Sequence, residues 1–272
     1  MEKYSEFRKS ATTNEEAIKR LVDIIELLRK ECPWDKEQTH ESLRNCMLEE
    51  AYEAADAIDR ADKANLREEL GDVLLQVIFH ASLASENNDF ALVDVINEEC
   101  EKMIRRHPHI FLEENIKSVD KVLEKWENIK SKEQGKVSQS QRLLSIPRAL
   151  PALTRSYKVQ KKAADVGFDW DDVSCAFSKI QEETEELKKA NKEGDMIGVT
   201  EELGDLLFSV VNVARFLKVD PEYALTLTSD KFIRRFAHIE ASAEAKGIKL
   251  EDMSLDEMDR LWEEAKSKEH NL

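Results

Sequence analysis

Hydrophobic residues recur every three or four positions along most of the chain. One stripe comprises Ile18, Leu21, Val22, Ile25 and Leu28, and similar stripes lie within 48–55 and 73–81. This spacing places the apolar side chains on one face of an α-helix. No segment alternates apolar and polar residues for long, as a half-buried strand would. We therefore predict an all-α fold.

The helical pattern is interrupted at five places. They are Cys32–Pro33, the region near Asp62, Asn87–Asp89, His107–Pro108 and Gly135–Pro147. The last interruption is the longest, and its segment GKVSQSQ (135–141) is small and polar, which is typical of a linker. We expect an N-terminal domain over 1–134, a linker over 135–147 and a C-terminal domain over 148–272.

The two halves of the chain repeat an acidic pattern. The sequence LEEAYE (48–53) is echoed by QEETEE (181–186), and EELGDVLL (68–75) is echoed by EELGDLLF (201–208). The offset is 133 positions for every acidic pair, for example from Glu50 to Glu183. This agreement indicates a duplicated domain, because the period is much longer than that of a helical solenoid.

Each half is predicted to fold its two acidic helices into an antiparallel hairpin. Glu50 and Glu53 share a helix face because they are three residues apart, and so do Glu69 and Asp72. Both cross-pairs have their midpoint at position 61, so a turn there brings the four carboxylates together. In the second half both midpoints fall on Gly194. The corresponding quartet there comprises Glu183, Glu186, Glu202 and Asp205.

Four clustered carboxylates repel one another unless they are protonated or bound to a cation. A donor set of oxygens alone, without His or Cys, suits hard cations such as Mg²⁺, Mn²⁺ or Ca²⁺. A single E-E-x-x-E motif in an acidic helical protein is usually a solvated helix face, but its symmetric repetition favours a metal site. The chain has no glycine-rich phosphate loop. A magnesium–carboxylate cluster therefore indicates a phosphate ester or anhydride substrate, whose oxygens the metal would bridge to the protein.

Cationic and aromatic residues also recur in both halves. The sequence KMIRR (102–106) matches KFIRR (231–235), and WENIKSKE (126–133) matches WEEAKSKE (262–269). Arginine offers bidentate contacts to phosphate, and tryptophan can stack on a base. A basic helix end or a helical Trp is more commonly structural, but the repetition favours a function. Among these repeated residues, the candidates for binding phosphate or base are Lys231, Arg234, Arg235, Trp262 and Lys266.

Composition narrows the class of protein. The chain has 272 residues, with 41 Lys+Arg against 57 Asp+Glu, and its net charge of −16 disfavours nucleic-acid or anionic-membrane partners. Seven Gly and five Pro argue against a β-sandwich or barrel. The first ten residues lack an apolar stretch, and the most apolar windows, 73–84 and 206–217, are too short to span a bilayer. The four cysteines have no C-x-x-C spacing, so we expect free thiols and a cytoplasmic location.

The combined motifs resemble the all-α nucleoside triphosphate pyrophosphohydrolases, and the MazG family in particular. The resemblance is carried by the acidic pairs and by CPWDKEQT (32–39), RRHPH (105–109), IPRALPAL (146–153) and VGFDW (166–170). It implies Mg²⁺-dependent hydrolysis of nucleoside triphosphates to a monophosphate and pyrophosphate, in control of the nucleotide pool. It also implies two tandem MazG domains and a homodimer whose helices complete four-helix-bundle-like cores.

The resemblance further implies that the C-terminal domain is the active one. There Glu183, Glu186, Glu202 and Asp205 would hold Mg²⁺, for which Mn²⁺ can substitute, and Glu182 or Glu186 would accept a proton from water. The resemblance also makes Lys179, Glu182 and Asn212 candidates for substrate binding. Three polar residues of this half, Lys179, Asn212 and Arg215, are replaced in the first half by residues of another kind. The residues at the corresponding positions are Cys46, Phe79 and Ser82.

Three alternatives stay open. The first half has an intact quartet of its own, so a second metal site is expected there and its activity is undecided. Its members are Glu50, Glu53, Glu69 and Asp72. The second alternative is a non-catalytic helical interaction protein with degenerate metal sites. An enzyme acting on another phosphate compound would also suit the cluster.

Overall fold

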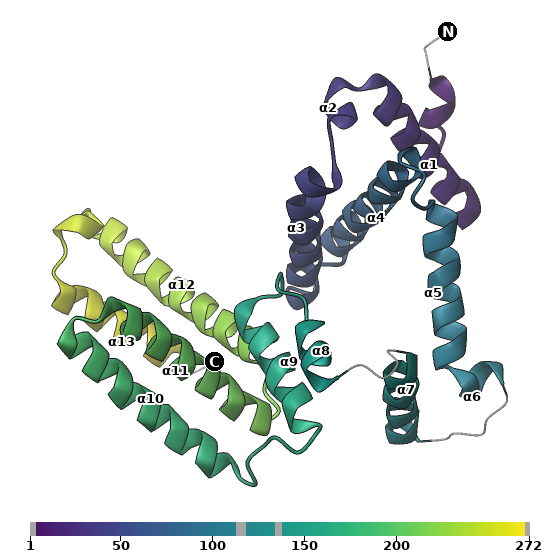
Figure 1. Ribbon diagram of the computed structural model, residues 1–272. Coiled ribbons are helices and arrows are strands. Elements are labelled where there is room, and N and C mark those ends of the chain that lie inside the picture. Colours follow the sequence, from purple (N-terminus) through teal and green to yellow (C-terminus); the bar gives the residue numbers. More distant parts are fainter. Residues whose placement is uncertain (1–3, 113–117, 134–137, 270–272) are drawn as a thin grey trace. The chain divides into compact units, whose positions relative to one another are not determined.

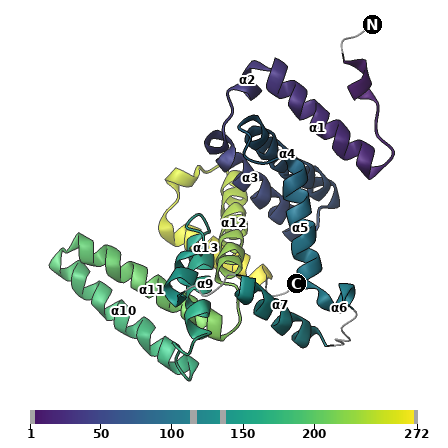
Figure 2. The ribbon, with the colours of Figure 1, turned by 45° about the vertical axis from the view of Figure 1, so that its right-hand side comes forward.

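The computed structural model describes residues 4–112, 118–133 and 138–269 (Figures 1 and 2). Within these ranges every regular element is a helix, which confirms the all-α prediction. The elements in order are η1 (Ser5–Arg8), α1 (Asn14–Glu31), α2 (Pro33–Lys36), α3 (His40–Asp59), α4 (Lys63–Glu86), α5 (Leu92–Arg106), α6 (Pro108–Phe111), α7 (Val119–Glu133), α8 (Gln139–Leu144), α9 (Ala152–Ala164), α10 (Val173–Glu193), α11 (Met196–Phe216), α12 (Pro221–Ala245), η2 (Leu250–Asp252) and α13 (Leu255–Glu269).

The chain divides into two compact units, which are described separately. The first unit is Met1–Gln134 and contains η1 to α7, and the second unit is Gly135–Leu272 and contains α8 to α13. The segment expected to be a linker therefore belongs to the second unit, and α8 lies within it. Ser138 and Gln141 cap this helix reciprocally, with backbone-to-side-chain distances of 3.0 and 3.2 Å. The polar residues of this segment thus form a capping box, a role that its composition alone did not predict.

In the first unit, α3 and α4 form the predicted hairpin, and α1 packs against α4. The unit's apolar core lies between these helices and comprises Ile25, Leu43, Ile78, Phe79 and Leu83. Because Ile25 comes from the first helical stripe and Ile78 from the third, the core joins the stripes that the sequence pattern identified.

Both predicted turns are confirmed. Ala61 lies between α3 and α4 with a left-handed φ of 53°, and the carboxylate of Asp62 then caps α4 by accepting two backbone N–H groups. In the second unit Gly194 ends α10 with a φ of 73°, and Asp195 caps α11 in the same manner. A left-handed residue followed by an N-cap reverses the chain in both units.

In the second unit, α10 and α11 lie side by side along their length, and α9 packs against α11 (Figure 1). The Gln160 side chain on α9 donates a hydrogen bond to the carbonyl oxygen of Phe208 on α11, at 2.8 Å. Helices α12 and α13 form a second pair, with Ile239 and Leu261 among its buried residues. The acidic hairpin and the α12–α13 pair, which carries the segment KFIRR (231–235), are thus two distinct helix pairs of one unit.

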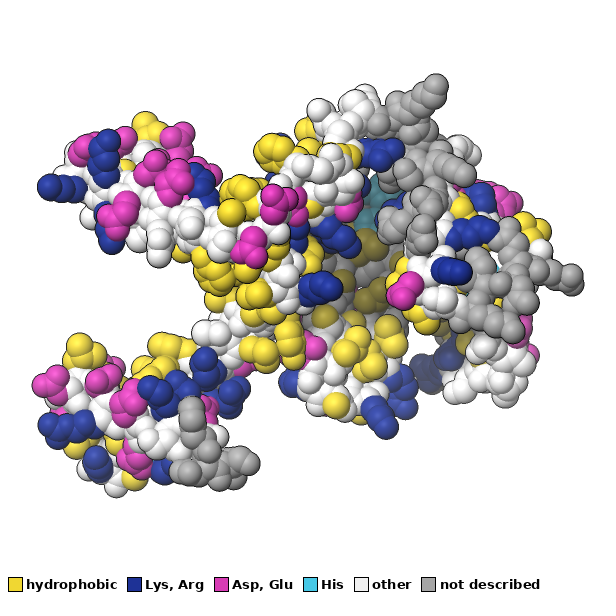
Figure 3. All heavy atoms as spheres, turned by 90° about the horizontal axis from the view of Figure 1, so that it is seen from below, with side chains coloured by type: hydrophobic (Ala, Val, Ile, Leu, Met, Phe, Trp, Pro, Cys, Tyr) yellow, Lys and Arg dark blue, Asp and Glu magenta, His cyan; other side chains and the backbone are white. Residues whose placement is uncertain are grey.

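Large apolar side chains stay exposed on several helices (Figure 3). On α11 the exposed residues include Leu203, Leu207 and Val210, which are spaced to share one face. None of the described helices combines the length and the low charge that a bilayer-spanning segment needs.

Candidate metal and nucleotide site

The hairpin of the second unit brings its predicted metal ligands together. Ligand oxygens of Glu183 on α10 and of Glu202 and Asp205 on α11 all lie within 4.8 Å of one another. Glu182, Glu183 and Glu186 form an overlapping group with the same spacing. We call Glu183, Glu186, Glu202 and Asp205 the second-unit cluster. The three-residue spacing of the acidic residues in each helix and the turn at Gly194 bring these carboxylates together, as the midpoint argument predicted.

The second-unit cluster is electrostatically strained. Glu183 is only 4% exposed. Burial raises the pKa of Glu202, and the negative charges of Glu186, Glu183 and Asp205 raise it further. Binding of a proton or of a cation would relieve this repulsion. Because all the donors are carboxylate oxygens, the cluster suits a hard divalent cation.

Lys179 lies at the edge of this cluster. Its ammonium nitrogen is 2.6 Å from Glu183 Oε1 and 2.8 Å from Glu182 Oε1. Hydrogen bonds to Glu182 and Glu183 raise the pKa of Lys179, so the side chain stays cationic. The structure thus brings together Lys179 and Glu182, two of the predicted substrate-binding residues, beside the predicted metal ligands.

The first unit holds a similar carboxylate group. Ligand oxygens of Glu50, Glu53 and Glu69 lie within 4.8 Å of one another, and Glu69 is 8% exposed. Burial and the charge of Asp72 raise the pKa of Glu50, with smaller contributions from Glu53 and Glu69. We call these four residues the first-unit cluster. At the position that corresponds to Lys179 it has Cys46.

Arg215 fastens the loop between α9 and α10 to α11. Its guanidinium donates to both carboxylate oxygens of Asp169, at 2.5 and 2.9 Å, and its Nε donates to Asn212 at 2.9 Å. It also lies over the ring of Phe216, 4.5 Å from the centroid. Asn212, a predicted substrate-binding residue, therefore already accepts a hydrogen bond within the unit. It lies seven residues beyond Asp205, about 10 Å along the same side of α11.

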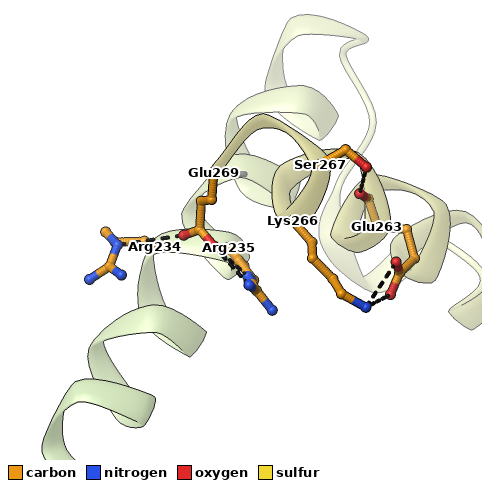
Figure 4. A network of polar contacts seen from close by, with 6 residues as sticks. All are labelled: Arg234, Arg235, Glu263, Lys266, Ser267 and Glu269. Atoms are coloured by element: carbon orange, nitrogen blue, oxygen red, sulfur yellow. Dashed lines mark hydrogen bonds and ion pairs between the residues drawn. The ribbon is translucent and has the colours of Figure 1, made fainter. Parts of the chain in front are cut away.

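The remaining predicted substrate-binding residues lie on α12 and α13, away from the carboxylates in sequence. Figure 4 shows three of them, Arg234, Arg235 and Lys266. Arg235 donates to Glu269 at 2.8 Å, and Arg234 is 3.6 Å from the same carboxylate. Lys266 pairs with Glu263 at 3.2 Å. Lys231 is half-buried on α12. The structure therefore gives Arg234 and Arg235 an acidic partner on α13 rather than on α10 or α11.

Trp262 belongs to the same network. The guanidinium of Arg235 lies 5.4 Å from its ring centroid, and the ring of Phe232 lies 5.0 Å away. The first unit repeats this arrangement, with Arg106 bonded to Glu133 and placed 5.7 Å from the ring of Trp126. Stacking of a base on Trp262 stays a prediction.

Sequence reasoning missed Glu133, Glu269 and Asp169. The first two end the repeated sequence SKE, and that repetition was the signal that could have identified them. The pairing of Asp169 with Arg215 spans 46 residues and has no repeat to reveal it.

Comparisons with known proteins agree with this geometry. The MazG nucleotide pyrophosphohydrolase domain matches residues 38–111 and 174–240, so each matched segment contains one acidic hairpin. The chain is 46% identical, over 248 residues, to a nucleoside triphosphate pyrophosphohydrolase/pyrophosphatase MazG of Thermotoga maritima. That alignment covers 90% of this chain and 94% of the relative. The chain belongs to the MazG family.

Other MazG-family proteins are similar over comparable or shorter lengths. A nucleoside triphosphate pyrophosphohydrolase of Escherichia coli K12 is 41% identical over 260 residues, covering 94% of this chain and 99% of the relative. A crystal structure of a mazG-related protein from Thermotoga maritima aligns with a TM-score of 0.38 and 34% identity, covering 42% of this chain and 98% of that one.

Proposed function

We propose that the chain is a Mg²⁺-dependent nucleoside triphosphate pyrophosphohydrolase whose active site is the second-unit cluster. The observation that carries the proposal is the convergence of Glu183, Glu202 and Asp205 within 4.8 Å, with Lys179 bound at its edge. The names of the similar proteins, nucleoside triphosphate pyrophosphohydrolases, supply the substrate class and the reaction. The physiological role that follows is control of the nucleotide pool.

The donor set of the second-unit cluster fits Mg²⁺, with Mn²⁺ as a substitute. Glu183, Glu186, Glu202 and Asp205 would hold the cation, and their mutual repulsion is the energetic reason for binding it. When bound, the metal would neutralise charge that develops on the phosphates and orient them for attack. Without it, the carboxylates would repel the substrate.

The chain's own residues would perform the remaining steps. Glu182, exposed and hydrogen-bonded to Lys179, is one candidate to accept the proton of the attacking water, and Glu186 is the other. Lys179 carries a positive charge to the edge of the phosphate site. Substrate phosphates and base would also be contacted by the predicted set on α11, α12 and α13, namely Asn212, Lys231, Arg234, Arg235, Trp262 and Lys266.

The test incubates purified chain with each nucleoside triphosphate and Mg²⁺ and separates the products. Nucleoside monophosphate and pyrophosphate are expected, whereas diphosphate and phosphate would contradict the proposal. Glu202→Gln should lower kcat/KM at least about a hundredfold, because it replaces a charged carboxylate ligand with a neutral amide. Its matched control is Glu201→Gln, which alters the exposed neighbour on the same helix. If only Glu69→Gln abolished turnover, the active site would lie in the first unit.

No turnover with either Mg²⁺ or Mn²⁺ would instead favour the non-catalytic interpretation. In that case the two clusters would be degenerate metal sites of a helical interaction protein.

The proposed active form is a homodimer. The apolar face formed by Leu203, Leu207 and Val210 on α11 is 45–50% exposed, and burial of such a face against another copy would stabilise the assembly. Light scattering should therefore give twice the mass of the chain, and Leu207→Glu should reduce it to one chain. Leu255→Glu, at the 81% exposed start of α13, is the matched control. A wild-type chain that remains monomeric at high concentration would refute the dimer.

A further inference from the structure

Lys179 stands between two carboxylates with different roles. Glu183 is buried and belongs to the second-unit cluster, whereas the side chain of Glu182 is 56% exposed and lies outside the cluster as defined. The ammonium nitrogen bonds both, at 2.6 Å to Glu183 and 2.8 Å to Glu182. The spacings of three and four residues allow one lysine to reach both from a single turn of α10.

A divalent cation in the second-unit cluster would compete directly with this ammonium. The cation needs oxygens of Glu183, one of which Lys179 already engages. It would also bring two positive charges next to a third, which is unfavourable beside Glu183, only 4% of which is exposed. Lys179 would have to release Glu183, but it could keep Glu182 and turn its freed donors toward another anion.

The first unit shows the same carboxylates without this competitor. Its equivalents of Glu182 and Glu183 are Glu49 and Glu50, and Cys46 stands where Lys179 stands in the second unit. Glu50 is subject to burial and to the repulsion of acidic neighbours, both of which raise its pKa. A cation could bind there without displacing an ammonium.

We propose that Lys179 is an internal counter-ion that competes with the divalent cation for Glu183, so that tight cation binding requires a nucleotide whose phosphate takes over the ammonium. This inference rests on the proposed function, since it concerns the metal and substrate of that same site. Cation and nucleotide then bind cooperatively, and linkage makes the effect reciprocal. The ordinary role of a substrate-binding lysine would not predict that its removal strengthens binding of the metal alone.

The experiment is a Mn²⁺ titration followed by electron paramagnetic resonance, without turnover. It uses the full chain carrying Glu69→Gln, which disables the first-unit cluster so that the second is measured alone. In this background Lys179→Met should tighten Mn²⁺ binding about three- to tenfold, the range expected for losing one half-exposed ion pair. Lys188→Met is the matched control, because it removes an exposed charge from the same helix, paired three residues away with Glu185. It should leave the affinity within about twofold.

A second arm adds a nucleoside triphosphate analogue with a methylene bridge between the α- and β-phosphates. The analogue should tighten Mn²⁺ binding in the parent and much less in Lys179→Met. A third arm inserts the competitor into the first unit, as Cys46→Lys in a Glu202→Gln chain, where Mn²⁺ binding should weaken by a similar factor.

The outcomes separate this inference from the proposed function. If Lys179→Met binds Mn²⁺ alone with unchanged or lower affinity, the counter-ion role is wrong while the active site stands. If instead Glu202→Gln binds as many Mn²⁺ ions as the parent, the cluster is not the metal site and the proposed function fails. Circular dichroism of each variant verifies that the helices are intact.

Discussion

Asp169 is expected to hold the loop between α9 and α10 onto α11, and Asp169→Asn tests this. Arg215 donates to both oxygens of the carboxylate, at 2.5 and 2.9 Å. The side chains of Asp169 and Arg215 are 26% and 12% exposed, so solvent screens this pair less than a surface pair. Phe216 beneath the guanidinium further restricts where Arg215 can turn when its partner is lost.

The size of the effect follows from these contacts. A hydrogen bond to a charged group contributes roughly 1.5–3 kcal/mol. Asparagine keeps one oxygen acceptor, replaces the other with an NH₂ group and removes the negative charge, so one of the two bonds is lost and the other is weakened. Because both side chains still reach solvent, we expect a loss of about 2 kcal/mol. This corresponds to roughly a thirtyfold increase in the opening equilibrium.

Hydrogen exchange measured by mass spectrometry reports the exchange rates of backbone amides in each unit separately within the intact chain. Amides near the C-terminal end of α11 should exchange roughly thirtyfold faster in Asp169→Asn, whereas those of α4 in the first unit should not change. A double-mutant cycle with Arg215→Met isolates the pair. The reasoning is refuted if exchange in α11 changes less than about threefold, or if the two substitutions are additive.

The remaining predictions concern the turns and the pH dependence of stability. Ala61→Gly should stabilise the first unit, and Gly194→Ala should destabilise the second, each by about 1 kcal/mol in denaturant titrations, because both positions have left-handed φ angles; shifts of the same sign would contradict this. In EDTA, Tm should fall as the pH rises above about 4.5. The raised pKa of Glu202 makes the folded state bind more protons than the unfolded chain in that window, so stability is lost as the pH rises. Mg²⁺ should restore the Tm near pH 7–8. Glu269 contributes to the pH dependence of stability with the opposite sign. Arg235 lowers the pKa of Glu269, so the stabilisation is present above the ordinary pKa of this carboxyl and is lost as the pH falls through the lowered value. A Tm in EDTA that climbs steadily to pH 8 would refute the effect assigned to the cluster.

The hairpins could be predicted because they depend on local regularities. Helical periodicity determines which acidic residues share a helix face. When two such faces meet in an antiparallel hairpin, the residues that face one another have a single midpoint in the sequence. In both units this arithmetic located the left-handed residue itself, Ala61 or Gly194. Ala61 is the more informative of the two, because alanine gives no turn signal and the acidic pairs located the turn within the interruption near Asp62.

Side-chain pairing between distant elements could not be predicted in the same way. In the comparison of the two halves Arg215 is a residue that only the second half has, and the sequence does not show that its guanidinium bonds Asp169 and Asn212. Arg235 was expected to face substrate, and it bonds Glu269 while lying over Trp262. Such contacts depend on how α9 packs on α11 and α12 on α13, which apolar periodicity leaves undetermined.

The two clusters differ in a way that connects stability with chemistry. Each hairpin gathers carboxylates whose repulsion disfavours the folded state, as the raised pKa values of Glu50 and Glu202 indicate. In the second unit Lys179 offsets part of this repulsion through Glu183. Cys46 offers no such charge in the first unit, so a bound cation has more repulsion to relieve there. If divalent cations bind both clusters, they should therefore stabilise the first unit more than the second when no nucleotide is present. Cys46 in place of lysine therefore has two effects in the first unit. It makes the cluster a better site for a cation without nucleotide, and it leaves no ammonium at this position to couple the cation to a phosphate.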